Sequence, residues 1–193
     1  MSNPTVDSNP SALIVIDVQN ALTEGLYGDP RPHNRDEMLG NIRTLLGKAR
    51  EAGAQVIYVQ HREDQYEAMS PGHHGFAIES SIAPEPGDPV FQKTVGDSFS
   101  NPELAPLLRN GGVVNVAVCG MQSDMCVQAS TRGAIANGFN VTLITDAHAT
   151  YDTDDKTAVE IMAEINQTLA EVSGEGTAVT PLPTAAVTFA GTR

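Results

Sequence analysis

The sequence has few basic residues, no tryptophan and no long apolar run. Only 11 lysines and arginines stand against 24 acidic residues, which gives a formal net charge of -13. Because phosphate contacts need a basic face, this charge argues against a nucleic-acid-binding protein of the usual kind. It also disfavours binding to anionic membrane surfaces. No apolar segment reaches the length of a membrane span. We therefore expect no nucleic-acid partner and no membrane partner.

Cysteine is almost absent. Cys119 and Cys126 are too few for a disulfide framework, which indicates free thiols in a reducing compartment. The polar N-terminal tail, residues 1–11, lacks the basic and apolar segments of a signal peptide. With 193 residues, the chain has the size of one compact domain. We expect a single domain over residues 1–193, located in the cytoplasm.

Short apolar segments alternate with helical patterns along the rest of the chain. The expected strands are 12–18, 55–60, 90–93, 113–118, 140–145 and 185–189. The expected helices run from a capping box of Asn34 and Glu37 to Gly53, from Asn101 to Gly111, over 125–137 and over 154–172. Such alternation predicts the α/β class: three αβα layers around a six-stranded parallel sheet of Rossmann-like order.

Residues 61–89 form a long irregular segment rich in proline and glycine. Loops of this length are uncommon without a function, so the segment is expected to line or cover a site. In parallel sheets, ligands bind beyond the carboxyl ends of the strands. The first polar residues after each strand are therefore the candidates for chemistry.

Asp17, Lys93 and Cys126 occupy such positions. Asp17 follows four apolar residues, where a carboxylate is costly unless it is paired, although an acid solvated at the strand end fits the pattern equally well. Lys93 ends the third strand and, taken alone, is an ordinary surface lysine. Together the three would supply a base, a cation and a nucleophile.

Cys126 begins the helix after the fourth strand. Free N–H groups and the positive dipole end at a helix start are expected to lower the pKa of this thiol and to bind an oxyanion. A buried, inert cysteine is the alternative, and Cys119, which lies inside the strand, fits that alternative better.

Three segments resemble the motifs of isochorismatase-like cysteine hydrolases. They are ALIVIDVQNALTEG around Asp17, GDPVFQKTVGDSFSNPEL around Lys93, and VAVCGMQSDMCVQASTRGAIANGFNVTLITDAHAT around Cys126. They stand in the family's order. The resemblance implies that Asp17 is the acid/base, Lys93 its electrostatic partner and Cys126 the nucleophile. It also implies a cis peptide between Met121 and Gln122, an oxyanion hole formed by the N–H groups of Gln122 and Cys126, and a homodimer or homotetramer.

The resemblance further implies hydrolysis of a C–N bond of a small molecule through a thioester, with no cofactor. The nicotinamidase branch holds a metal with an Asp-x-His element, which is missing here, although His61, His73 and His74 are available in principle. Two other functions stay open. One is vinyl-ether hydrolysis of an isochorismate-like anion, with Arg62 as a second cation. The other is a non-catalytic small-molecule binder, which an unreactive Cys126 would indicate.

Overall fold

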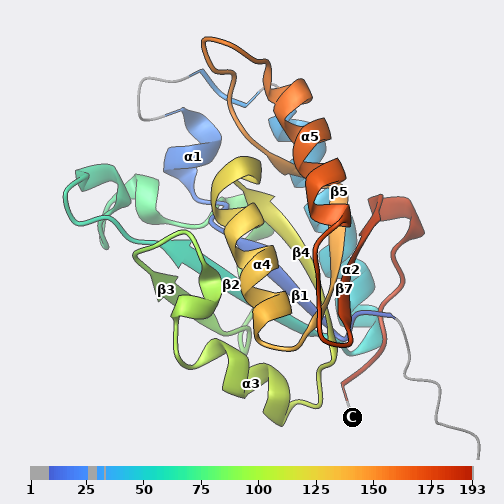
Figure 1. The fold of residues 1–193 in the computed structure, drawn as a ribbon. Coiled ribbons are helices and arrows are strands. Elements are labelled where there is room, and N and C mark those ends of the chain that lie inside the picture. Colours follow the sequence, from blue (N-terminus) through green and yellow to red (C-terminus); the bar gives the residue numbers. More distant parts are fainter. Residues whose placement is uncertain (1–8, 26–29, 33, 193) are drawn as a thin grey trace, which may run out of the picture.

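The structure is a computed structural model that describes residues 9–25, 30–32 and 34–192. The expected polar tail therefore falls largely outside the described residues. One sheet of seven strands runs through the molecule in the order β3-β2-β1-β4-β5-β7-β6 (Figure 1). The strands are β1 Ala12–Ile16, β2 Gln55–His61, β3 Val90–Lys93, β4 Asn115–Met121, β5 Asn140–Ala149, β6 Ser173–Gly174 and β7 Thr177–Leu182. All neighbouring pairs are parallel except β6 and β7.

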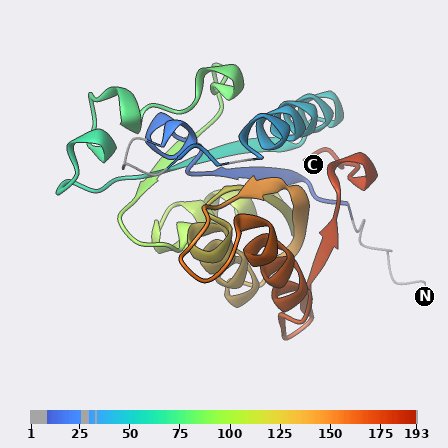
Figure 2. The same ribbon diagram turned by 90° about the horizontal axis from the view of Figure 1, so that it is seen from above.

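Helices cover both faces of this sheet, as the αβα prediction requires. The α-helices are α1 Asn20–Glu24, α2 Arg35–Ala52, α3 Leu104–Asn110, α4 Gln128–Ala136 and α5 Ala158–Ala170. Helix α2 lies on one face, and α3, α4 and α5 lie on the other (Figure 2). Strand β1 shows why the sheet is buried on both sides. Leu13 and Val15 pack in the core beneath α2, and Ile14 and Ile16 pack in the opposite core.

The position of the last parallel strand corrects the sequence analysis. Residues 185–189 are not a strand: Thr184–Ala186 is a 3-10 turn, and Val187 is buried in the core beneath α2. The strand is β7 instead, despite Pro181. The N–H of Val179 donates outward to Val172, so the nitrogen of Pro181, two residues later, lies on the outer edge. Proline is tolerated there because β6 pairs only with Thr177 and Ala178.

The ends of the helices agree with the sequence-based prediction better than the capping interactions do. Helix α2 ends at Gly53, which adopts the left-handed conformation expected of a terminating glycine. The expected capping box at its start is wrong, because the side chain of Asn34 makes no cap and donates to the carbonyl of His148 instead. A capping box does open α5, where Thr157 and Glu160 exchange hydrogen bonds. No helix of the described residues has both the length and the apolar character of a membrane span.

Residues 62–89 link β2 to β3 as an irregular segment, in agreement with the sequence. It holds three short 3-10 turns, Glu67–Met69, His74–Phe76 and Ser80–Ile82. The segment rises on the α2 side of the sheet and passes beside α1 (Figure 2). It thereby forms one wall above the carboxyl ends of β1 and β2.

Candidate active site

Asp17 stands immediately after β1, and its backbone has a φ of 51°. Few residues other than glycine adopt this left-handed conformation, and it turns the chain sharply at the carboxyl end of the strand. The side chain of Asp17 is fully buried. The alternative of a solvated strand-end acid is therefore wrong. Gly120 makes the close approach of β1 and β4 possible, because a Cβ on it would lie 2.0 Å from the carbonyl oxygen of Ile16.

Lys93 is the last residue of β3, and its side chain is also fully buried. Its Nζ lies 2.6 Å from Oδ2 of Asp17. The interpretation of Lys93 as an ordinary surface lysine is therefore wrong. Burial raises the pKa of Asp17, and the neighbouring ammonium opposes that rise. Lys93 thus favours the ionised form of Asp17, which burial disfavours.

Cys126 completes the group. After β4 the Met121–Gln122 peptide bond is cis, and residues Ser123–Val127 form one π-helical turn before α4 begins. The N–H groups of Met125 and Val127 both donate to the carbonyl of Gln122, which closes this turn. Sγ of Cys126 lies 3.2 Å from Nζ of Lys93. The structure thus brings together the three residues that the sequence singled out.

The expected lowering of the thiol pKa is wrong for the resting site. Burial and, to a smaller extent, the negative charge of Asp17 raise the pKa of Cys126 to about 12, although Lys93 opposes both. Burial is the largest of these effects, because a thiolate loses its hydration in a dry position. Cys119, inside β4, is completely buried and its pKa is raised by burial alone.

One proton shared between two acids explains how such a thiol can react. Oδ1 of Asp17 is buried and accepts no hydrogen bond from the described residues. An oxygen of this carboxylate lies within 4.8 Å of Sγ of Cys126. When the proton moves from sulfur to Asp17, Lys93 still faces one anion, and the net charge of the three groups does not change. The thiolate can therefore form for reaction without a second charge in the dry site.

His61, the last residue of β2, is a fourth member of this site. Its Nδ1 lies 3.4 Å from Nζ of Lys93. Burial and the charge of Lys93 lower the pKa of His61 to about 4, so the ring is neutral at pH 7. Because Nδ1 faces the ammonium, the ring proton belongs on Nε2. Sequence reasoning considered His61 only as a metal ligand, although its place at the end of a central strand matches that of Asp17 and Lys93.

A metal ion fits this arrangement poorly. Asp17, His61 and Cys126 place one ligand atom each within 4.8 Å of one another. However, Nζ of Lys93 contacts all three side chains, so an ammonium already occupies the position between these donors. His73 and His74 do not join them. They are exposed and pair with Glu67 and Glu24, respectively.

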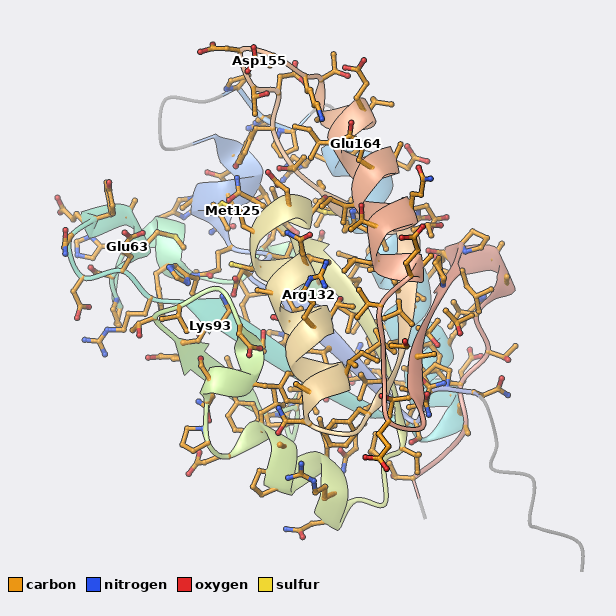
Figure 3. The ribbon with its side chains drawn as sticks, viewed as in Figure 1. Glu63, Lys93, Met125, Arg132, Asp155 and Glu164 are labelled. Carbon is orange, nitrogen blue, oxygen red and sulfur yellow. The ribbon has the colours of Figure 1, made fainter. Side chains whose placement is uncertain are left out.

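A cavity of about 370 Å³ opens above Cys126. It is lined by Asp17, Leu22, His61, Glu63, Met69, Gly96, Gln122, Met125, Cys126 and Tyr151. Glu63, Lys93 and Met125 come from three different elements around the carboxyl ends of β2, β3 and β4 (Figure 3). The long segment after β2 contributes Glu63 and Met69, as its expected role in lining a site predicts. Arg62 is not in this lining. It pairs with Asp64 at 2.7 Å and faces a separate hollow.

A second polar chain lies behind the turn, and sequence reasoning missed it. The hydroxyl of Ser123 lies 2.7 Å from Nδ1 of His148, and Nε2 of His148 lies 2.9 Å from Oδ1 of Asn166. The amide of Asn166 donates to the carbonyl of Thr145, so its oxygen accepts from His148 and the ring accepts from Ser123. Ser123 and His148 are fully buried, and neither lines the cavity.

Comparison with known proteins gives one consistent family. The isochorismatase domain matches residues 11–174. A streptothricin hydrolase of Streptomyces noursei is 40% identical over 141 residues, which cover 73% of this chain and 55% of that protein. A ureidoacrylate amidohydrolase of Agrobacterium fabrum is 30% identical over 176 residues, which cover 74% of this chain and 77% of that protein. The chain thus spans about half the length of the streptothricin hydrolase.

Solved structures agree with this family. An isochorismatase of Pseudomonas putida superposes with a TM-score of 0.81 at 28% identity, covering 96% of this chain and 94% of that one. A cysteine hydrolase of Pseudomonas syringae gives a TM-score of 0.80 at 25% identity, covering 96% and 95%. The predicted fold class is confirmed, with seven strands in place of six.

Proposed function

The chain belongs to the isochorismatase family of hydrolases, and from that premise we propose that it cleaves a C–N amide-type bond of a small molecule with Cys126 as nucleophile. One observation carries this proposal. Nζ of Lys93 contacts both Oδ2 of Asp17 and Sγ of Cys126, and Asp17 and Cys126 line the cavity. A base, a cation and a thiol are thus held together where a substrate carbonyl can enter.

The reaction proceeds in two halves. Asp17 takes the thiol proton, and the sulfur of Cys126 attacks the carbonyl carbon to form a tetrahedral oxyanion. The backbone N–H groups of Gln122 and Cys126 donate to that oxyanion. As the C–N bond breaks, Asp17 returns the proton to the leaving amine and a thioester remains. Water then attacks the thioester, Asp17 accepts its proton, and release of the acid regenerates the thiol.

The cavity favours this reaction over vinyl-ether hydrolysis of an isochorismate-like anion. Among its described lining residues there is no lysine or arginine, and Lys93 behind them is already paired with Asp17. Arg62, the expected second cation, faces away. Relatives support the same choice, because one is named an amidohydrolase. The matched part is about half of the streptothricin hydrolase, so the substrate of that protein is not transferred to this chain.

The decisive experiment screens a panel of small amides for released ammonia or amine, with Cys126→Ala as control. We expect release by the wild type that the variant lacks, and an acyl adduct on Cys126 in the mass spectrum of the quenched enzyme. Release that persists in Cys126→Ala would overturn the thiol mechanism. A wild-type protein that binds amides but releases nothing would be the non-catalytic binder.

Three further properties belong to the proposal. The reaction needs no cofactor, because Lys93 fills the place between the donors that a metal would use. Restoration of activity by a metal after chelation would contradict this.

The protein acts as a homodimer or homotetramer in the cytoplasm, as the family resemblance implies. Light scattering that gives 20.4 kDa at micromolar concentration would contradict the oligomer.

A further inference from the structure

The cavity lining holds two carboxylates, Asp17 of the triad and Glu63, and among the described residues no lysine or arginine pairs with Glu63. It lies two residues beyond β2, and its side chain is 43% exposed. The only described ion-pair contact of Glu63 is with Nε2 of His61, at 3.9 Å. Since that ring is neutral at pH 7, the contact leaves the negative charge of Glu63 uncompensated.

The position of this charge relative to the triad is defined by the His61 ring. Nδ1 of His61 faces Lys93, and Nε2, on the opposite side of the ring, faces Glu63. Glu63 is therefore separated from the ammonium by the width of one imidazole. A substrate whose carbonyl reaches Cys126 would bring a group a few bonds away to Glu63.

Apolar side chains complete the surroundings of Glu63. Leu22, Met69, Met125 and Tyr151 line the same cavity, and Met125 is 58% exposed. Flexible methionines adapt to the methylenes of varied ligands. An apolar wall that carries one unpaired carboxylate matches an aliphatic chain that ends in a cation. The net charge of -13 also favours the approach of such a molecule.

We propose that Glu63, with Met69 and Met125, forms a subsite for a protonated amine carried by the substrate on a short aliphatic chain. The proposal rests on the proposed function, because it places the scissile amide at Cys126. It assigns Glu63 to substrate selection and gives it no part in the bond cleavage.

The test uses two amides of the same length, 5-aminopentanamide and hexanamide, which differ in a terminal ammonium against a methyl group. The ratio of their kcat/KM values is measured for the wild type, for Glu63→Gln and for Glu67→Gln. Glu67 is the matched control, because it lies in the same segment, outside the cavity lining, and is 84% exposed. We expect the wild type to prefer the ammonium, Glu63→Gln to reduce that preference roughly tenfold, and Glu67→Gln to retain it.

A binding measurement separates this proposal from the proposed function. Calorimetric titration of Cys126→Ala and of the Cys126→Ala, Glu63→Gln double variant with both amides gives the same ratio without turnover. Preferential binding of the ammonium that Glu63→Gln removes supports the subsite, even if no amide is cleaved and the proposed function fails. Cys126-dependent turnover without ammonium preference sustains the proposed function and overturns the subsite. A ratio that Glu63→Gln leaves unchanged by both readouts overturns it as well.

Discussion

Two chains of contacting polar side chains flank β4, and they differ in whether every buried polar atom has a hydrogen-bond partner. On the β1 side, the oppositely charged Asp17 and Lys93 adjoin the thiol of Cys126, and Asp17 and Cys126 line the cavity. On the β5 side, Ser123 and His148, with Asn166 of α5, form a neutral chain that faces the protein interior. Burial lowers the pKa of His148, which keeps its ring uncharged.

The difference lies in hydrogen-bond satisfaction. Every link of the Ser123 chain has a partner, down to the carbonyl of Thr145. In the other chain, Oδ1 of Asp17 has none among the described residues. A satisfied chain holds a structure in place, whereas a buried oxygen without a donor can accept a proton during a reaction. Serine, histidine and an amide in line are therefore not evidence of chemistry unless the serine reaches a cavity.

The largest expected effect separates the two cysteines. Cys126→Ala should reduce hydrolysis by on the order of a thousandfold or more, because the variant lacks the thiol that contacts Lys93. Cys119→Ala should keep the activity and lose about 1 kcal/mol of unfolding free energy, since this side chain is buried in the core. Steady-state kinetics with chemical denaturation check both. Equal losses of activity in the two variants would contradict the assignment.

The next effect tests whether the charged chain acts as one unit. Asp17→Ala and Lys93→Ala should each reduce kcat/KM by on the order of a hundredfold. The kcat/KM of the double variant should be only slightly below that of the less active single variant. Without Lys93 the carboxylate loses the only ammonium that contacts it among the described residues, so the pKa of Asp17 should rise and its proton-accepting form should be depleted at pH 7. A double-mutant cycle measures the coupling, and strictly additive losses would show that the two residues act independently.

The sequence was sufficient to predict the strands that bear the triad. For β1 and β4 the signal is local, because both are largely apolar, as burial on both faces requires. The last strand was missed because β7 contains Pro181, whose tolerance depends on which edge its nitrogen faces. The apolar character of residues 185–189 resembled that of a strand, but Val187 packs in the core beneath α2. Lys48 of α2 also donates to the carbonyl of Val187.

The site divides in the same way. Strand-end positions pointed to Asp17, Lys93 and Cys126, but the thiol pKa depends on burial by segments far away in sequence. Ser123, His148 and Asn166 are separated by 25 and 18 residues, and no spacing rule joins them. His61 stands at a strand end, but only the structure shows its contact with Lys93, and Glu63 became a candidate only through its place in the cavity lining. Sequence thus singled out the three side chains that the structure brings together, whereas the surrounding contacts needed three-dimensional structure.

A smaller effect should distinguish the neutral chain by stability. Ser123→Ala leaves Nδ1 of His148 buried without a donor, which should lower the unfolding free energy by about 2 kcal/mol. The loss in kcat/KM should stay far below that of the triad variants, because Ser123 does not line the cavity. Denaturant unfolding and kinetics on the same preparation check this. Activity abolished at unchanged stability would instead assign the chain a direct part in catalysis.

The smallest expected effect concerns His61, which joins the charged chain without carrying charge itself. The pKa of His61 is lowered from 6.5 to about 4, so between these pH values the unfolded chain binds a proton that the folded protein does not. The contribution of His61 to stability is thus fully present above about pH 6.5 and is lost as the pH falls toward 4. The 2.5-unit difference would correspond to about 3 kcal/mol at most, and the partial exposure of the ring reduces this to about 1–2 kcal/mol.

His61→Gln should remove this part of the pH dependence, since glutamine does not titrate. The unfolding free energy of the variant should therefore decline less than that of the wild type between pH 6.5 and 4, in urea titrations at half-unit steps. His73→Gln is the matched control, because that histidine is 44% exposed and lies outside the cavity lining. His148 is present in both proteins. The difference in pH dependence between the wild type and His61→Gln therefore reports on His61 alone. Identical slopes in the two proteins would mean that His61 titrates alike in the folded and unfolded chains, and that its contact with Lys93 does not hold the ring neutral.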